Sequence, residues 1–337
     1  MKIAILLGGS SSEREVSLAS GKAVATALKS KGHDILIFDP AVGERIIELD
    51  EILPDGIHGV IPSESELQKL SPKNYIDAVN SKLLDNVDLV FLTLHGKWGE
   101  DGMIQSLLEF RNIKYTGSKV FSSALTMDKA MTKILMKQNG ILTADWLTAN
   151  KKSDVENIKN EIKNKIGFPL VVKPNDQGST VGLTIVENEN QISDAISLAL
   201  QFSETALIEK FIPGRELTVS IIKDKVLPII EIKPKDGFYD YAHKYTKGMT
   251  EYFCPAELDK NLTEQIQFAT KKLFDVCNCS GFARVDFRLQ DDGKFYCLEI
   301  NTIPGMTATS LVPKAAKATG IEFPELCEMI CRLTLEE

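Results

Sequence analysis

A hairpin is predicted over Gly281-Phe-Ala-Arg-Val-Asp-Phe-Arg-Leu-Gln-Asp-Asp-Gly-Lys-Phe-Tyr-Cys-Leu-Glu-Ile-Asn301, where apolar and polar residues alternate on both sides of Asp292-Gly293. Asp-Gly is a preferred pair for a two-residue hairpin loop. A tight turn at this pair places Asp286 opposite Glu299 and Arg284 opposite Asn301. Side chains that alternate along paired strands fall on two different faces.

One face of this hairpin is predicted to be core and the other to carry chemistry. The core face comprises Val285, Phe287, Leu289, Tyr296, Leu298 and Ile300. Two carboxylates directly across a strand pair repel each other, so Asp286 opposite Glu299 favours a cation between them. With Asn301 they supply three oxygen-bearing side chains, which suit Mg²⁺. The alternative is a solvated outer face of the sheet.

Composition bounds the class of protein. The chain has 337 residues, enough for two or three domains, and its 43% hydrophobic and 26% charged residues are ordinary for a globular fold. It has no run of about 18 apolar residues, the length needed to span a membrane. The short apolar run at residues 3–7 leads into a Gly-Gly turn, unlike a signal peptide. We therefore expect a cytoplasmic protein without a membrane segment.

Charge and cysteine content exclude other classes. The net charge is -8 and no block of Lys and Arg stands out, which argues against nucleic acid as a partner. The six cysteines contain no Cys-x-x-Cys pair and only four histidines could complete a zinc site. We expect reduced, mostly buried thiols.

The order of predicted elements indicates an α/β domain followed by α+β modules. Apolar runs at 3–7, 34–38 and 87–94, with helical patterns at 13–30 and 103–111, are typical of a parallel sheet with function at its strand ends. A new pattern of helices and short strands begins near residue 126. We expect an N-terminal parallel α/β domain at 1–125 and two α+β modules at 126–212 and 213–337. Residues 44–84 receive no function.

Several shorter features are ambiguous alone. Gly8-Gly9 follows a strand, but neither a Rossmann nor a P-loop pattern is present. Glu13 could hold an ammonium group, or it could simply stabilise the first turn of a helix. Lys173 ends an apolar strand and needs an anion, which could be a phosphate or a structural salt-bridge partner.

A glycine-flanked loop and two acids add to this set. Residues 176–182 carry two hydroxyls and could lie over phosphates. Glu209 and Glu216 could accept hydrogen bonds from an adenine amino group and ribose hydroxyls, although solvated surface is the alternative.

In this order, the features resemble the ATP-grasp superfamily and, within it, the D-alanine:D-alanine ligase family. Over nearly the whole chain, the motifs that carry the resemblance are Leu7-Gly-Gly-Ser-Ser-Ser-Glu-Arg-Glu-Val-Ser-Leu-Ala-Ser-Gly21, His95-Gly-x-x-Gly-Glu-Asp-Gly102, Tyr115-Thr-Gly-Ser118, Met127-Asp-Lys129, Val172-Lys-Pro174, Gly178-Ser-Thr-Val-Gly182, Phe238-Tyr-Asp-Tyr241, Lys244-Tyr245, Phe253-Cys-Pro255 and Glu299-Ile-Asn-Thr-Ile-Pro-Gly-Met-Thr307. Thr180 stands where a second serine is common, and Lys97-Trp98 fill variable positions. Neither departure removes a functional group.

The resemblance implies sites for ATP and metal between the two α+β modules. For ATP the implied residues are Lys129 and Lys173 at the phosphates, Glu209 at the adenine, Glu216 at the ribose, and the backbone of Lys210 and Ile212 along the adenine slot. Asp286, Glu299 and Asn301 would bind two Mg²⁺ or Mn²⁺ ions, with Glu299 bridging them.

The resemblance also implies a D-alanine site. Its implied members are Glu13 at the first ammonium with His95 nearby, Ser179 and Tyr245 hydrogen-bonded with Glu13, Lys244 at the transferring phosphoryl group, Arg284 and the Gly305 N–H at the oxyanion, and Ser310 with Leu311 at the second carboxylate. The loop at 234–250 is a candidate lid.

The implied activity is ATP-dependent ligation of two D-alanines through a D-alanyl phosphate, for peptidoglycan precursors and the cell wall. A homodimer is implied by the family alone. One rival is a ligase for D-lactate or another acceptor, and Tyr245 argues against D-lactate because phenylalanine accompanies hydroxy-acid use in that family. The other rival is an inactive ATP-binding regulatory protein, against which the intact Arg284 and predicted metal ligands argue.

Overall fold

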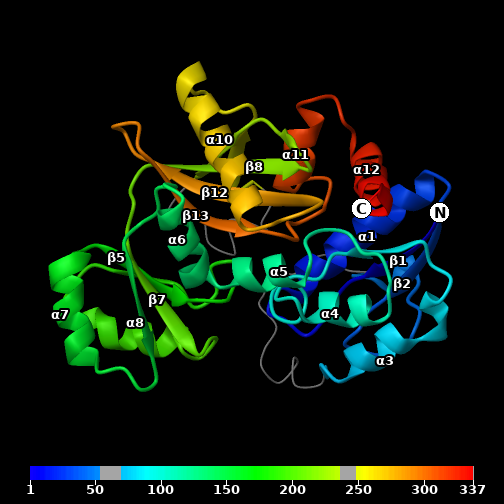
Figure 1. Ribbon diagram of the computed structural model, residues 1–337, viewed down its shortest axis with the longest axis horizontal. Coiled ribbons are helices and arrows are strands. Elements are labelled where there is room, and N and C mark those ends of the chain that lie inside the picture. The colour runs from blue at the N-terminus through cyan, green and yellow to red at the C-terminus, as the bar shows by residue number, and fades with distance from the viewer. Residues whose placement is uncertain (54–69, 236–247, 337) are drawn as a thin grey trace.

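The computed structural model describes residues 1–53, 70–235 and 248–336, and these form three sheets with their covering helices (Figure 1). The N-terminal sheet has the order β2-β1-β3, with β1 at Lys2–Leu6, β2 at Asp34–Phe38 and β3 at Leu89–Leu92. Both pairings are parallel, as the sequence predicts. The apolar strands β1 and β3 are almost wholly buried, as parallel strands covered on both faces are.

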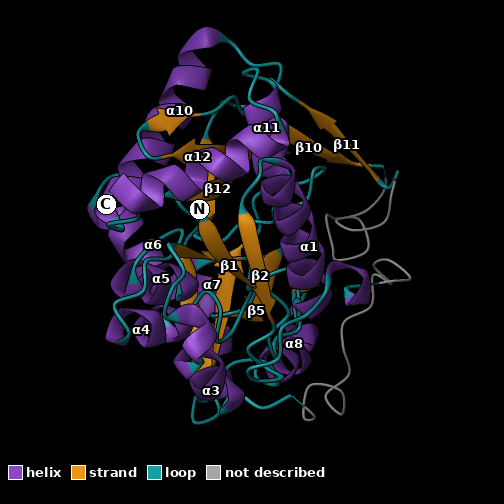
Figure 2. Cartoon of the chain, turned by 90° about the vertical axis from the view of Figure 1, so that its right-hand side faces the viewer, coloured by secondary structure: helices purple, strands orange, loops and turns teal. Residues whose placement is uncertain are grey.

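Helices cover this sheet, and α1 and α4 lie in the predicted places. α1 spans Arg14–Ser30 and lies beside β1 and β2 (Figure 2), while α3 spans Asn74–Asn80 and α4 spans Met103–Phe110. Within the described ranges, no helix is both long and apolar enough to traverse a lipid bilayer.

The end of the chain returns to complete the N-terminal core. α11 (Leu311–Lys317) and α12 (Phe323–Glu336) contribute buried residues to the same apolar cluster as β1 and α1. Lys31 at the end of α1 pairs with Glu325 at 2.8 Å, and the two chain ends lie close together (Figure 1). The first and last parts of the chain are therefore packed as one unit. The predicted division at residues 125 and 212 stays a prediction.

The middle sheet is antiparallel, with the order β4-β7-β5-β6. Its strands are β4 (Trp146–Asn150), β5 (Leu170–Pro174), β6 (Thr184–Val186) and β7 (Thr205–Lys210), covered by α7 (Val155–Lys165) and α8 (Ile192–Ala199). α5 (Val120–Met127) and α6 (Lys129–Gln138) precede it. Asp128 begins α6 because its carboxylate accepts a hydrogen bond from Met131 N at 2.9 Å.

The third sheet follows the order β11-β10-β8-β12-β13, with β9 (Lys225–Val226) paired to β8. Its strands are β8 (Arg215–Ile222), β10 (Ile230–Pro234), β11 (Thr250–Phe253), β12 (Phe282–Leu289) and β13 (Phe295–Asn301), with α10 (Lys260–Val276) packed on one face. Cys277 and Cys297 are buried in this core, whereas Cys254 and Cys279 are half-buried.

The hairpin β12–β13 confirms the predicted pairs but not the predicted turn. Asp286 faces Glu299 and Arg284 faces Asn301. Gln290 N donates to Lys294 O at 2.9 Å, so the loop comprises residues 291–293 rather than two residues, and it ends on Gly293 at φ 83°. A three-residue loop of this kind ends in a left-handed residue.

The longer loop shifts the register between β12 and β13 by one residue, and a bulge further along β13 restores the predicted register. The ladder steps from Phe287–Cys297 to Asp286–Glu299, which leaves Leu298 as the extra residue of β13. Cys297 therefore joins the core, where it is fully buried, and the predicted core positions of Tyr296 and Leu298 are wrong because both are only half-buried.

Candidate active site

Two cavities adjoin where the three sheets meet. The first cavity has an empty volume of about 970 Å³ and lies between the middle and third sheets. The second cavity, of about 1040 Å³, lies between the loop after β1, the loop after β3 and the chain from β13 to α11. Both are lined by Gly178, Ser179, Arg284, Glu299 and Leu311. The shared residues make the two cavities one continuous site.

The first cavity collects every residue predicted to contact ATP. It is lined by Lys129, Lys173, Glu209, Lys210, Ile212 and Glu216. Its walls also include Leu298, which the bulge in β13 turns toward it, and Arg288, whose Nε donates to Ile212 O at 3.1 Å. The sequence analysis did not identify Leu298 or Arg288 as site residues.

Charge in the first cavity is centred on Glu209, which is 3% exposed. Its carboxylate pairs with Lys173 Nζ at 2.5 Å and with Lys133 Nζ at 2.7 Å. Burial alone would raise the pKa of Glu209, but the two ammonium groups outweigh it and lower that pKa to about 2. Burial likewise favours a lower pKa for Lys173, yet pairing with Glu209 raises it. Sequence reasoning missed Lys133, although it follows Lys129 by one helical turn.

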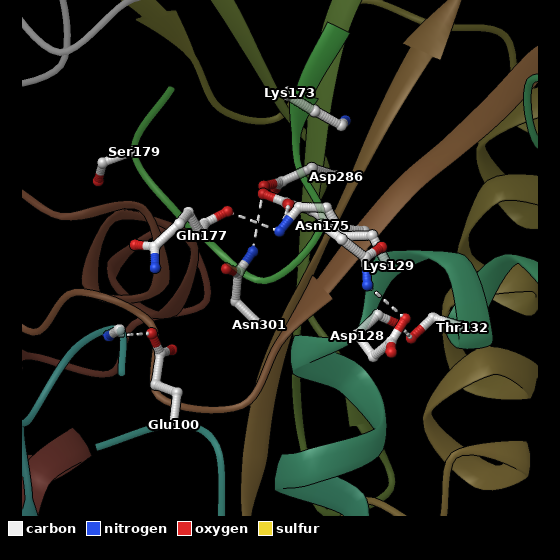
Figure 3. A network of polar contacts seen from close by, with 12 residues as sticks. Glu100, Asp128, Lys129, Thr132, Lys173, Asn175, Gln177, Ser179, Asp286 and Asn301 are labelled. Carbon is white, nitrogen blue, oxygen red and sulfur yellow. Dashed lines mark hydrogen bonds and ion pairs between the residues drawn. The ribbon is translucent and has the colours of Figure 1, made fainter. Parts of the chain in front are cut away.

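The start of α6 is fastened to the glycine-rich loop. Asn175 Nδ2 donates to Asp128 Oδ1 at 2.8 Å, and Ala130 N donates to Asn175 Oδ1 at 2.9 Å. Lys129 Nζ donates to Gln177 O at 2.7 Å and lies 3.3 Å from Glu299 Oε2. Lys129 therefore stands between the loop and the hairpin acids (Figure 3).

The predicted metal ligands project from β12 and β13 into this junction. Asp286 accepts hydrogen bonds from Arg284 Nε at 2.9 Å, Thr218 Oγ1 at 2.5 Å and Asn301 Nδ2 at 3.3 Å. In the described ranges no three His, Cys, Asp or Glu residues cluster as metal ligands do. The predicted set is instead two carboxylates and an amide, and their oxygens fit a hard divalent cation.

The second cavity contains a buried carboxylate with one open oxygen. Ser179 Oγ donates to Glu13 Oε1, while no hydrogen-bond donor of the described chain reaches Glu13 Oε2. A Cβ on Gly178 would lie 2.6 Å from Glu13 Oε2, so any other residue there would displace the Glu13 carboxylate. A buried carboxylate with a free oxygen is ready to accept an ammonium group.

His95 and Glu100 line the second cavity beside Glu13. Burial lowers the pKa of His95, so the imidazole is neutral. Glu100 accepts a hydrogen bond from Gly96 N at 2.7 Å, and burial followed by the nearby Glu13 charge raises its pKa to about 8. The sequence analysis quoted Glu100 within the motif that begins at His95 but gave it no role.

The far wall of the second cavity is the turn before α11. Gly305, Ser310 and Leu311 all line it, as predicted for the second carboxylate and the oxyanion. Ser310 Oγ accepts a hydrogen bond from Thr307 N at 3.0 Å, which fixes the hydroxyl at the cavity edge.

Two predicted residues and most of the candidate lid lie outside the described ranges. Lys244 and Tyr245 belong to residues 236–247, and the described ends of that loop are Pro234 and Thr250, which pair across β10 and β11. The roles of Lys244 and Tyr245 stay predictions.

Comparisons with known proteins agree along the whole chain. A family model described as D-ala D-ala ligase N-terminus matches residues 2–118, and one described as D-ala D-ala ligase C-terminus matches residues 135–332. The D-alanine--D-alanine ligase of Aquifex aeolicus (strain VF5) is 42% identical over 330 residues, which cover 98% of this chain and 99% of the relative. That of Syntrophotalea carbinolica is 40% identical over 329 residues, 98% of this chain and 94% of the relative.

Solved structures give the same result. D-alanine--D-alanine ligase from Bacillus anthracis complexed with ATP aligns with a TM-score of 0.78 at 32% identity, covering 100% of this chain and 98% of that one. The VanG D-Ala:D-Ser ligase from Enterococcus faecalis aligns with a TM-score of 0.81 at 31% identity and 99% coverage of each chain. The fold is the predicted ATP-grasp arrangement behind a parallel α/β domain, and the chain belongs to the D-alanine–D-alanine ligase family.

Proposed function

We propose that this chain joins two D-alanine molecules, with ATP bound in the first cavity and D-alanine in the second. The observation that carries the proposal is the shared wall of the cavities, where Arg284 and Glu299 face both. A group transferred from a nucleotide to a carboxylate must pass through such a junction. A match to an ATP-complexed relative over the whole chain supports the nucleotide.

In the first cavity, the basic residues take the phosphates and the acids take the nucleoside. Lys129 and Lys173 bind phosphate oxygens, Glu209 accepts from the adenine amino group, and Glu216 accepts from the ribose. The backbone of Lys210 and Ile212 lines the adenine slot. Both lysines have carboxylate partners within 3.3 Å, which phosphates would replace as counter-charges.

In the second cavity, Glu13 takes the ammonium group of the first D-alanine through its open oxygen. This orients the substrate carboxylate toward Arg284 and the ATP γ-phosphoryl group. The substrate carboxylate attacks the γ-phosphorus, the bond from that phosphorus to ADP breaks, and the products are D-alanyl phosphate and ADP. This activation is needed because a carboxylate is a poor electrophile until one of its oxygens becomes a leaving group. Neutral His95 adds no second charge beside the ammonium.

The second D-alanine is held by its carboxylate at Ser310 and the Leu311 backbone, with its amine directed at the acyl phosphate. Arg284 and the Gly305 N–H donate to the oxyanion that forms, and removing one such donor typically costs about 3 kcal/mol. Collapse releases phosphate and the dipeptide.

Asp286, Glu299 and Asn301 would hold two Mg²⁺ or Mn²⁺ ions, which supply positive charge to the phosphates when bound. Asp286 accepts hydrogen bonds from three residues, Thr218, Arg284 and Asn301, so it is held in place without the metal. Lys129 near Glu299 offsets part of the negative charge of the set.

The test is phosphate release across D- and L-amino acids and D-hydroxy acids, with products weighed by mass spectrometry. We expect that D-alanine, added as the single amino acid, supports ATP-dependent phosphate release. One dipeptide should form for each phosphate released. ATP hydrolysis without dipeptide, or no dependence on D-alanine, contradicts the proposal.

The same experiment decides the acceptor. A relative named as a D-Ala:D-Ser ligase aligns as well as the D-alanine ligases do, so D-serine belongs in the panel beside D-lactate. Tyr245 favours an amine over D-lactate on sequence grounds. If Tyr245→Phe forms more D-alanyl-D-lactate near pH 6 than the parent, Tyr245 is a specificity residue, and an unchanged ratio removes it.

The homodimer is proposed from the family alone, and the cytoplasmic location is proposed from the sequence. Sedimentation of the purified chain tests the first, and fractionation of cells tests the second.

A further inference from the structure

Lys133 is a buried lysine that lines neither the first nor the second cavity. Its side chain on α6 is 0% exposed, and Nζ makes three contacts: Glu209 Oε2 at 2.7 Å, Thr143 Oγ1 at 2.7 Å and Ala144 O at 3.2 Å. The Trp146 ring lies against it, with its centroid 5.5 Å from Nζ. Burial lowers the pKa of Lys133, and the charge of the adjacent Glu209 carboxylate opposes that effect.

Lys133 and Lys173 hold opposite sides of one carboxylate. Lys173 lines the first cavity and pairs with Oε1 of Glu209, whereas Lys133 pairs with Oε2 and lines neither the first nor the second cavity. A nucleotide phosphate can therefore draw Lys173 away from Glu209. It cannot reach Lys133.

This asymmetry has an energetic consequence. A carboxylate 3% exposed that loses its sole cation becomes an unpaired buried charge, which is strongly unfavourable. With Lys133 in place, Glu209 keeps one partner while Lys173 serves the phosphates. Without Lys133, binding of the phosphates by Lys173 and binding of the base by Glu209 compete.

The support behind Lys133 also connects two sheets. Thr143 Oγ1 accepts from Lys133 and donates to Cys297 O at 2.8 Å, and Cys297 N donates to Leu142 O at 2.8 Å. Cys297 adjoins the bulge of β13 that aims Leu298 into the first cavity. The ammonium is thus held at a fixed joint between the middle and third sheets.

We infer that Lys133 is a positioning residue that keeps Glu209 charged and aimed at the nucleobase, so that the first cavity selects a 6-amino purine over a 6-oxo purine. The inference rests on the proposed function, since it takes the first cavity as the nucleotide site. A 6-amino group donates to a carboxylate, whereas a 6-oxo group presents a second acceptor to it.

The test is direct titration of ATP and GTP with Mg²⁺, without D-alanine, against the purified chain and Lys133→Met. We expect Lys133→Met to lose about tenfold or more in ATP affinity with little change for GTP, so the ATP-to-GTP affinity ratio falls by the same factor. The matched control is Lys137→Met, one turn along α6, where an exposed lysine also lies over Trp146, 5.2 Å from its centroid. Lys137→Met should keep the parent's ratio.

A second pair of variants separates positioning from folding. Glu209→Gln and the double variant Lys133→Met/Glu209→Gln should share one ATP-to-GTP ratio, because Lys133 acts through the carboxylate. The double variant removes both buried charges and leaves neither unpaired. It decides the question even if Lys133→Met alone does not fold.

The outcomes distinguish this inference from the proposed function. A parent chain that does not bind ATP overturns the proposed function. A parent that prefers ATP while Lys133→Met keeps the same ratio overturns the inference alone, as does a double variant whose ratio falls well below that of Glu209→Gln.

Discussion

The two adjoining cavities balance their charged groups differently. In the first, Glu209 has two ammonium partners and its pKa falls to about 2. In the second, Glu13 keeps an oxygen without a donor in the described chain, and the pKa of Glu100 rises to about 8. Lysines, arginines and carboxylates all line the first cavity, whereas among the described residues Arg284 is the one Lys or Arg that lines the second, beside Glu13, Glu100 and Glu299. A cationic substrate group would supply the positive charge that the second cavity is short of, and this difference separates the expected effects of mutation.

The largest effect is expected at the junction of the cavities. Glu299→Gln should lower turnover roughly 10³-fold or more, because it removes a negative charge from the proposed metal ligands. The protein should stay folded, because the substitution leaves the apolar core behind the hairpin unchanged. Steady-state rates at saturating Mg²⁺ beside thermal melts check this. Glu204→Gln, at an exposed position, is the matched control. Normal turnover in Glu299→Gln would contradict the assignment of Glu299 as a ligand of two metal ions.

A smaller effect is expected within the second cavity alone. Glu13→Gln should raise KM for D-alanine about 100-fold, since a charge-assisted contact worth about 3 kcal/mol is lost. ATP affinity should stay at the parent value, as titration without D-alanine would show. If Glu13→Gln weakens ATP binding as much as it raises KM for D-alanine, the charge of Glu13 acts on both cavities and the contrast between them is wrong.

The deficit of positive charge should also appear in stability. The folded chain holds the Glu100 proton to pH about 8, whereas the unfolded chain releases it near 4.5. Because the folded state then binds more protons, the free energy of unfolding should fall as pH rises through this window, by up to about 1.4 kcal/mol per pH unit.

Glu100→Gln should flatten that slope, since a neutral side chain does not titrate and can still accept from Gly96 N. Urea denaturation without ligand at pH 5, 6, 7 and 8 measures it. Glu204→Gln should keep the parent's slope. Equal slopes in the parent and Glu100→Gln would mean that this carboxyl is ionised throughout the range.

The smallest effect tests the bulge in β13. Leu298→Ala should weaken ATP binding about three- to tenfold with little loss of stability, because Leu298 lines the first cavity. Ile300→Ala, two residues along the strand and buried in the core, should instead cost roughly 2–5 kcal/mol of stability. Melting curves and ATP titration of both variants check this. A large loss of stability in Leu298→Ala with unchanged ATP affinity would mean that Leu298 is a core residue.

Sequence pattern predicted the parallel opening and the hairpin pairs, and the family resemblance implied most of the described residues that line the two cavities. It succeeded at Asp286 and Glu299 because alternation is local and the family motifs are specific. It failed at Leu298 because the hairpin loop has three residues and a bulge in β13 compensates for the extra one. The pairs beyond the bulge, such as Asp286 with Glu299, are then as predicted, but Leu298 is the unpaired extra residue. Neither has a distinct pattern signal in a single sequence.

Other site residues were missed for a different reason. Lys133 resembles any helical lysine until Glu209, far along the chain, is brought next to it from the lining of the first cavity. The packing of α12 against α1 likewise depends on contacts between chain ends. Such long-range pairings are set by tertiary structure rather than by local spacing.

The central claim is that a D-alanine carboxylate in the second cavity attacks ATP in the first. D-alanine labelled with oxygen-18 in its carboxylate tests it most directly, with the released phosphate analysed by mass spectrometry. The account predicts one oxygen-18 atom in each phosphate for every dipeptide formed. Unlabelled phosphate alongside normal dipeptide synthesis would contradict it.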